Sequence, residues 1–302
     1  MTTLILGHVA DDHAIHVLRR LRDRGQDAEL LDSNDYPTRL GLFYDPARRG
    51  GALRLPGGRR LNLDHVRSVY WRSYGGIGAV ELPDPGQAAL AANDARGLFE
   101  SLLIGLRARW VNGWNAFLLH QTKPEQLARV AALGMPVPAT LLSNDPDSVQ
   151  AFAAWHPRCV FKPVQGGAHT RRLGPGHLAK EHLRNLAFAP VTIQEEIPGT
   201  DVRVFVAGQR VLACEVRTGH VDFRDDPDPR ITLCTLPEDV AAWCLRAARA
   251  LELTWTGIDL RRTPDGRHVF LEANPSPMFL GFEARAGLPL TDALVALLLE
   301  PP

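Results

Sequence analysis

Two strand-forming stretches near the C-terminus, residues 257–261 and 268–272, flank a Pro-Asp-Gly turn and restrict the fold more than any other feature. The turn favours a tight reversal, so we expect the two stretches to pair as antiparallel neighbours. Side chains alternate between the faces of a strand, which places Glu272 and Asn274 on one face and Asp259 opposite them. Two carboxylates and one amide oxygen form a ligand set that suits Mg²⁺ bound with phosphate groups. The alternative for such acids is solvation or a salt bridge.

The composition is that of a globular chain. The 302 residues are 45% hydrophobic and 23% charged, which suffices for two or three lobes with their own cores. The formal net charge of +0 gives no support to nucleic-acid or membrane partners, and no apolar run reaches the roughly 20 residues that a transmembrane helix needs. The N-terminal stretch does not resemble a signal peptide, and the cysteines show no C-x-x-C spacing. We therefore expect a cytoplasmic protein with reduced thiols.

The first third of the chain alternates strand and helix. An apolar run at 4–6 precedes a helix that ends at Gly25, and residues 28–31 form a second strand. The loop after the first strand lacks the Gly-x-Gly-x-x-Gly pattern, so no dinucleotide site is expected. Short strands and a long amphipathic helix follow; they are expected at 40–44, 52–55, 66–71 and after Pro85.

The remainder of the chain mixes short helices with strands, and strands dominate its second half. The predicted class is α/β, with α+β character in the C-terminal half. Helices are expected at 124–133, 146–155, 237–251 and 288–299, and strands at 140–142, 160–162, 191–197, 202–206 and 211–216.

Two lysines and a glycine-rich loop are candidates for phosphate binding. Lys162 lies within an apolar strand, where an unpaired ammonium group is costly, so it must reach solvent or meet an anion. Gly166 and Gly167 follow it, and a loop of this kind can present N–H groups to a phosphate. The pattern is not that of a P-loop. Lys123 begins a helix after a loop.

Arginines lie between these lysines and the acidic strand pair. Arg203 and Arg217 fall on the two strands of a predicted hairpin, and Arg224 follows them. The guanidinium group matches the geometry of phosphate and carboxylate groups. The alternative is that each arginine is an ordinary surface charge. The aromatic and basic residues at 71–74 are either a substrate-facing cluster or interdomain packing, and no residue is distinguished as a general base.

Taken in order, these residues resemble the ATP-grasp ligases of the RimK type over residues 121–298. Lys123 and Lys162 look like the two lysines that contact the nucleotide in that family, and the short loop with Gly166 and Gly167 replaces the longer Gly-Ser-x-Gly loop of its typical members. The segment after residue 193 is similar to the hinge whose backbone reads adenine. The hinge residues implied by the resemblance are Gln194, Glu195, Glu196 and Ile197.

The resemblance also implies roles for the charged residues of the C-terminal half. Asp201 matches the acid that approaches the ribose. One arginine belongs with Asp201 to the family's Asp-x-Arg, and two more match positions that face the phosphates and an acyl phosphate. Three oxygen donors match the metal positions of the family. These residues are Arg203, Arg217 and Arg224 for catalysis, and Asp259, Glu272 and Asn274 for the metal.

The implied architecture is an ATP-grasp fold in three parts. A pre-ATP-grasp βαβ domain is expected at 1–110, a central subdomain with the lysines and glycine loop at 111–190, and a C-terminal subdomain with the hinge, arginines and metal site at 191–302. ATP is expected between two antiparallel sheets, with two Mg²⁺ ions or, in their place, Mn²⁺.

The N-terminal sequence at 60–72 resembles that of ligases which macrocyclise ribosomal peptides, the microviridin or graspetide maturases. This likeness implies an acyl-phosphate mechanism acting on a precursor peptide, with ester or amide bonds formed. One departure is that residues 274–279 lack the Gly-Gln-Trp of the microviridin ligases, which weakens the peptide assignment more than the ATP chemistry. The alternatives are a RimK-like ligase joining an amino acid to a small metabolite or a protein terminus, and a nucleotide-binding regulator without catalysis. A homodimer is possible, although no interface signature is present.

Overall fold

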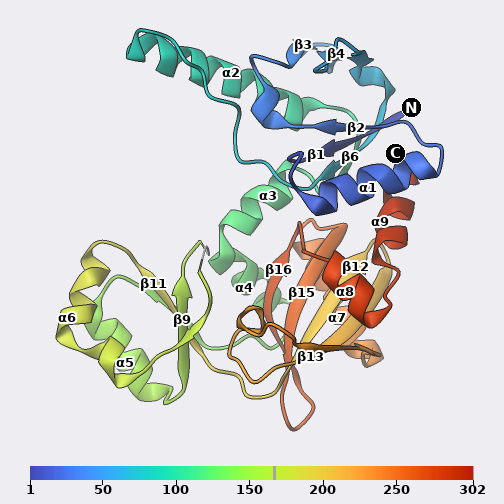
Figure 1. The fold of residues 1–302 in the computed structure, drawn as a ribbon. Coiled ribbons are helices and arrows are strands. Elements are labelled where there is room, and N and C mark those ends of the chain that lie inside the picture. The colour runs from blue at the N-terminus through green and yellow to red at the C-terminus, as the bar shows by residue number, and fades with distance from the viewer. Residues whose placement is uncertain (166–167, 302) are drawn as a thin grey trace.

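The structure is a computed structural model that describes residues 1–165 and 168–301. Gly166 and Gly167, which the sequence analysis assigned to a phosphate loop, lie outside the described residues. Figure 1 shows an N-terminal domain, a C-terminal sheet beneath it, and a smaller central subdomain to one side. Within the described residues, no helix has the length and hydropathy needed to cross a membrane.

The N-terminal domain begins with the predicted βαβ unit. Its parallel sheet has the order β2-β1-β6-β7, and helix α1 (Asp12–Asp23) packs against it. Asp11 caps this helix by accepting hydrogen bonds from the N–H groups of His13 and Ala14, and Gly25 follows the helix at a φ of +69°. The strands are β1 (Thr2–Leu6), β2 (Ala28–Leu31), β6 (Val66–Trp71) and β7 (Arg109–Val111).

An antiparallel sheet of order β3-β4-β5 and a long helix complete this domain. The helix α2 (Pro85–Gly105) starts after an Asp84 cap and buries Phe99, Leu102 and Leu103. Leu98, on the same helix, is 36% exposed. The short strand β5 was not predicted. The strands are β3 (Gly41–Asp45), β4 (Gly50–Arg54) and β5 (Arg60–Asn62).

Two helices, α3 (Trp114–Gln121) and α4 (Lys123–Ala132), connect the N-terminal domain to the central subdomain, and α3 was not predicted. The central sheet is antiparallel, with the order β10-β9-β11-β8. Helix α5 (Pro146–Trp155) has the predicted bounds. The strands are β8 (Thr140–Ser143), β9 (Cys159–Pro163), β10 (Arg171–Arg172) and β11 (Val191–Glu195), and the small helix α6 (Lys180–Leu183) lies between β10 and β11.

The C-terminal sheet is antiparallel, with the order β14-β13-β12-β15-β16. Its strands are β12 (Thr200–Ala207), β13 (Arg210–Arg217), β14 (Arg230–Cys234), β15 (Trp255–Arg262) and β16 (His268–Asn274), of which β14 was not predicted. The helices are α7 (Glu238–Ala250), α8 (Leu280–Ala286), which was not predicted, and α9 (Leu290–Leu299).

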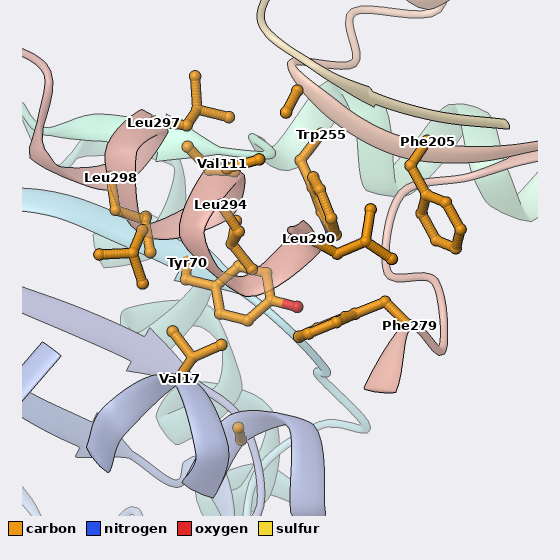
Figure 2. Close-up of a cluster of buried hydrophobic side chains, with 14 of the residues drawn as sticks. Val17, Tyr70, Val111, Phe205, Trp255, Phe279, Leu290, Leu294, Leu297 and Leu298 are labelled. Carbon is orange, nitrogen blue, oxygen red and sulfur yellow. The ribbon is translucent and has the colours of Figure 1, made fainter. Parts of the chain in front are cut away.

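The C-terminal helix joins the two larger parts of the molecule. Helix α9 places Leu294 and Leu298 against Val17 and Tyr70 of the N-terminal domain, and Trp255 of the C-terminal sheet lies in the same cluster (Figure 2). All five side chains are fully buried. This shared core fixes the N-terminal domain over one end of the C-terminal sheet.

Candidate active site

The acidic strand pair has the geometry that its sequence predicts. Strands β15 and β16 are antiparallel, with Asp259 directly opposite Glu272 and Asn274 opposite Gly257. The register shifts just after Asp259, at a bulge in the ladder. The Asn274 Oδ1 atom accepts a hydrogen bond from the Ser276 N–H at 2.9 Å. Two carboxylates and an amide oxygen therefore gather at one end of the sheet.

Glu272 is held as a carboxylate by the two predicted nucleotide lysines. The Lys123 ammonium lies 3.0 Å from Glu272 Oε2. Burial by itself would raise the pKa of Glu272, but the charges of Lys123 and Lys162 outweigh it and lower the pKa to about 2. This interaction draws helix α4, strand β9 and strand β16 to a common point.

Asp259 is paired with the buried Arg203. The Arg203 Nη1 atom donates to Asp259 Oδ1 at 2.5 Å, and the guanidinium carbon lies 5.5 Å from the ring centre of Phe205. A Cβ at position 257 would come within 2.7 Å of Arg203 Nη2, so glycine there makes room for the guanidinium group. Burial raises the pKa of Asp259, although Arg203 opposes this shift. A cation at this carboxylate would relieve that penalty.

Lys162 lies on the central sheet and faces the same cluster. Burial lowers the pKa of Lys162, while the carboxylates of Glu272 and Asp259 act in the opposite direction. Its Nζ atom reaches Gln194 Oε1 at 3.4 Å, and Gln194 in turn donates to Thr140 Oγ1 at 2.9 Å. Among the described residues, the half-buried Lys162 ammonium thus has one long hydrogen bond, to a neutral group, which is a suitable setting for an anion.

Arg224 approaches the cluster from the loop after β13. It is paired with Asp222 at 2.5 Å, and this ion pair raises the pKa of Arg224, with Glu272 adding to the shift. Asp222 Oδ2 also accepts the Thr170 N–H at 3.2 Å from the central subdomain. His169 and Asp225 make a second contact across the same gap, at 2.5 Å. The loop that carries Arg224 therefore bridges the two subdomains.

Arg217 is not brought to this cluster. Arg203 is opposite both Cys214 and Asp259, so these residues share one face of the sheet. Glu215 and Arg217 lie on the other face. There the exposed Arg217 guanidinium lies 3.2 Å from Glu215. The two hairpin arginines that were predicted to act together are thus separated by the sheet.

The predicted hinge follows β11 and leads into β12. The N–H groups of Glu195 and Glu196 donate to the carbonyls of Ala139 and Arg158, both at 2.9 Å. The Ile197 carbonyl accepts from Arg261 Nε at 3.0 Å. Among the described residues, the Ile197 N–H donates no hydrogen bond.

The predicted ribose acid, Asp201, pairs with Arg261 Nη1 at 2.5 Å. Burial raises the pKa of Asp201, and Arg261 partly offsets the shift. Asp201 is on the same face of the sheet as Arg203 and Asp259. It lies at the strand end that adjoins the hinge.

The donor set fits a hard divalent cation. Among the described residues, no group of three His, Cys, Asp or Glu side chains is arranged to hold a metal. A cation bound by Asp259, Glu272 and Asn274 would complete its coordination with water and phosphate oxygens, which is how Mg²⁺ is usually held. Lys123 already neutralises Glu272, and Arg203 already neutralises Asp259. Each acid would therefore contact both its basic partner and the cation.

A cavity of about 210 Å³ adjoins Asn274 at the junction with the N-terminal domain. The predicted cluster at 71–74 lines it, and Trp71 and Tyr74 also pack together edge to face. Arg72 is fixed in its wall by Asp11 at 2.9 Å and by the Ser276 carbonyl at 2.6 Å. This cluster therefore serves both interdomain packing and the lining of a cavity next to the acidic strand pair.

Three further residues close to this site were not found from the sequence. His120 lines the cavity, and burial lowers its pKa. The buried side chains of Asn112 and Gln126 hydrogen bond to the backbone around Asn274. The polar character of Gln126 on the apolar face of a predicted helix was the signal that could have identified it.

Comparisons with known proteins agree with this geometry. Residues 185–298 match the RimK-like ATP-grasp domain family. A probable alpha-L-glutamate ligase of Xanthomonas euvesicatoria pv. vesicatoria (strain 85-10) is 33% identical over 199 residues, which are 61% of this chain and 66% of that protein. The match thus spans just under two thirds of that relative.

Solved structures match over nearly the whole chain. The ATP-grasp ligase PsnB, complexed with a minimal precursor, has 33% sequence identity and a TM-score of 0.83, and the match covers 98% of both chains. The macrocyclase MdnC of Microcystis aeruginosa MRC, bound with precursor peptide MdnA, shares the fold at a TM-score of 0.86 and 24% identity, over 99% of this chain and 100% of that chain. PsnB has also been solved with Mg and ADP. On its sequence, its fold and the shared domain, this chain belongs to the ATP-grasp ligases of the RimK-like type.

Proposed function

We propose that this protein is an ATP-dependent, ADP-forming ligase that joins a carboxylate to a hydroxyl or amine through an acyl phosphate. The observation that carries the proposal is the cluster in which Lys123, Lys162 and Arg203 surround the paired acids Asp259 and Glu272. Such a cluster can bind a triphosphate together with a divalent cation. An acid of the substrate would enter beside it.

The reaction has two steps, and positioning with charge neutralisation accounts for most of the first. A substrate carboxylate oxygen bonds to the γ-phosphorus while the bond from that phosphorus to ADP breaks. A hydroxyl or amine then attacks the acyl carbon, phosphate leaves, and the nucleophile loses its proton. The product is therefore lighter than the unmodified peptide by the mass of one water for each bond formed, and the oxygen that the carboxylate loses leaves in the phosphate.

The residues of this chain have separate tasks in that scheme. Lys123 and Lys162 neutralise phosphate oxygens from two sides, and the Ile197 N–H is placed to contact adenine. Arg203 and Arg224 stabilise the phosphoryl group as it moves. A divalent cation held by Asp259, Glu272 and Asn274 would supply further charge neutralisation at the phosphates. We propose that two such cations bind, the number that the family resemblance implies.

We further propose that the substrate is a precursor peptide whose acidic side chains are joined to hydroxyl or amine side chains. The support is the likeness over 98% of the chain to PsnB, which was solved with a precursor. The alternative is transfer of an amino acid to a small molecule or protein terminus. The 33% identity to a probable alpha-L-glutamate ligase favours that alternative.

ADP formation tests the proposal directly. The enzyme is assayed with ATP and Mg²⁺, either with peptides that contain Glu, Asp, Ser, Thr and Lys or with free glutamate. Peptide-dependent ADP release, with loss of one water per bond by mass spectrometry, is the expected result. Added hydroxylamine should trap the acyl phosphate as a hydroxamate.

Glu272→Gln is the matched variant, and it should remove the activity. Turnover with free amino acids but with no peptide would overturn the peptide assignment. Turnover that persists unchanged in Glu272→Gln would overturn the site. A wild-type protein that binds ADP and Mg²⁺ but releases no ADP with any substrate would support a regulator without catalysis.

A further inference from the structure

One edge of strand β16 has no neighbouring strand among the described residues, although this strand carries Glu272 and Asn274. Backbone N–H and C=O groups at such an edge need other partners. The Phe270 N–H donates to the Pro136 carbonyl at 2.8 Å. At Ala273, between the two candidate cation ligands, the partner is a side chain.

Gln126 completes the edge at Ala273. Its Nε2 atom donates to the Ala273 carbonyl at 2.9 Å, and its Oε1 atom accepts the Ala273 N–H at 3.1 Å. A carboxamide offers the same donor and acceptor as a peptide group, so Gln126 substitutes for one residue of a missing strand. The side chain is buried, with only 3% of the residue exposed.

Helix α4, which carries Gln126, also contacts the side chain of Glu272, the residue before Ala273. Lys123 and Gln126 are three residues apart on α4 and share one face of the helix. Lys123 holds the Glu272 carboxylate while Gln126 holds the adjoining backbone. Helix α4 therefore fixes the position of Lys123 relative to strand β16, which carries the two candidate cation ligands.

Asn112 fixes the strand beyond Asn274. Its Nδ2 atom donates to the Pro275 carbonyl at 2.9 Å and to the Trp255 carbonyl at 2.7 Å. Its Oδ1 atom accepts the Thr254 N–H at 2.8 Å. Asn274 thus lies between two backbone positions that buried carboxamides hold.

We propose that Gln126 is a positioning residue for the divalent cation: its carboxamide fixes Ala273 and thereby sets the spacing of Glu272 and Asn274. The inference rests on the proposed function, because it presupposes that these two side chains bind a cation with the nucleotide. Mg²⁺ demands near-ideal octahedral geometry, so a small movement of either ligand weakens binding. A carboxamide that only satisfies an exposed strand edge would contribute to stability alone.

The test is Gln126→Met, which keeps the length and volume of the side chain and removes both hydrogen bonds. ADP binding is measured by calorimetry on the full chain, across a range of Mg²⁺ concentrations and in the absence of Mg²⁺. The Mg²⁺ concentration needed for half-maximal enhancement of ADP binding should rise by roughly 10- to 100-fold, the usual effect of removing a residue that orients metal ligands. The affinity for ADP without Mg²⁺ should stay within about twofold of the wild type, a criterion that we set to separate cation positioning from general loss of the site.

Two controls separate positioning from stability. Gln209→Met is the same chemical change at an exposed site, where the side chain accepts a hydrogen bond from Arg249. Val240→Ala lowers stability from the buried face of α7 and leaves both hydrogen bonds of Gln126 to Ala273 in place. Both should retain the Mg²⁺ dependence of the wild type. Hydrogen exchange at the Ala273 amide should be slow in the wild type and faster in Gln126→Met.

The possible outcomes are distinct. If wild type shows no Mg²⁺-dependent ADP binding, the proposed function fails and this inference fails with it. If wild type shows it and Gln126→Met is unchanged, only the inference is overturned. Should Gln126→Met fail to fold, Gln126→Leu is the second variant. Fast exchange at Ala273 in the wild type would overturn the proposed geometry without any variant.

Discussion

The two sheets that meet at the candidate site hold their side chains with different firmness. In the C-terminal sheet, Asp259 and Glu272 each have a charged partner, Arg203 or Lys123, within 3.0 Å, and large apolar clusters cover both faces. In the central sheet, the hydrogen bond that Lys162 makes within the described part of the chain is 3.4 Å long, and the buried core is small. The C-terminal half of the site, with Asp259 and Glu272, is therefore preset, because basic groups of the protein already pair with its acids. The other half, at Lys162, is completed only when an anionic ligand binds.

The largest effect should follow from a substitution in the preset half. Asp259→Asn removes a carboxylate that no neighbour can replace, and turnover should fall by roughly a thousandfold, since a bound cation contributes several kcal/mol to such reactions. Asp265→Asn, in the exposed turn between the same two strands, is the matched control and should keep full activity. The measurement is the steady-state rate of ADP release. Activity within tenfold of wild type would show that Asp259 is not a cation ligand.

Core truncations should break the two sheets unequally. Phe270 is fully buried in the cluster between the C-terminal sheet and α7, so Phe270→Ala should lower the free energy of unfolding by about 3–5 kcal/mol. Ile193 belongs to the small core of the central subdomain, and Ile193→Ala should cost about 2 kcal/mol, near the low end for its class. Chemical denaturation of both variants measures the difference. Equal losses would contradict the contrast between the sheets.

Acid should weaken the attachment of the N-terminal domain to the preset half. Burial, with a contribution from Arg72, lowers the pKa of His13 from 6.5 to about 4. The unfolded chain therefore binds this proton at a higher pH than the folded chain does. The free energy of unfolding is therefore unaffected by His13 above pH 6.5 and decreases as the pH falls towards 4, by up to about 3 kcal/mol.

His13→Leu is the control for this pH dependence, because leucine fills a similar volume beside Phe279 and carries no titrating group. The free energy of unfolding is compared for the two proteins between pH 7 and pH 4. The gap between wild type and variant should change across that range. Parallel curves would show that His13 is protonated alike in the folded and unfolded chains.

Local pattern was sufficient to predict the strand pairing of the site, whereas the placement of Arg217 required the register of the hairpin β12–β13. The pairing of Asp259 with Glu272 was predicted from alternation and a Pro-Asp-Gly turn, and it is confirmed. The face on which Arg217 lies depends on the register of the hairpin. Gly208 and the residue after it form a two-residue turn, with Gly208 at a φ of +60°, so Arg203 pairs with Cys214 and Arg217 falls on the opposite face of the sheet. Counting across that turn would have separated the two arginines.

Other features of the site could not be read from local sequence. Gln126 and Asn112 act on backbone groups more than 140 residues away in the chain, and no local period encodes such a contact. The cavity at 71–74 depends in the same way on the docking of the N-terminal domain. The family resemblance thus predicted the fold, and local pattern predicted the pairing of Asp259 with Glu272. Neither predicted the neutral groups that hold the backbone beside these acids.

The smallest effect should come from the half of the site that awaits its ligand. Because burial lowers the pKa of Lys162, its ammonium group destabilises the folded protein, and Lys162→Met should unfold no more readily than wild type. The same change should weaken ADP binding by about tenfold, equivalent to about 1.4 kcal/mol, through loss of one phosphate contact. Lys180→Met, in the short helix α6 away from the site, should change neither quantity. Stability and affinity would then move independently, as expected of a side chain whose charge is matched only when phosphate is bound. A parallel loss of both would place Lys162 with the preset half and remove the distinction between the two sheets.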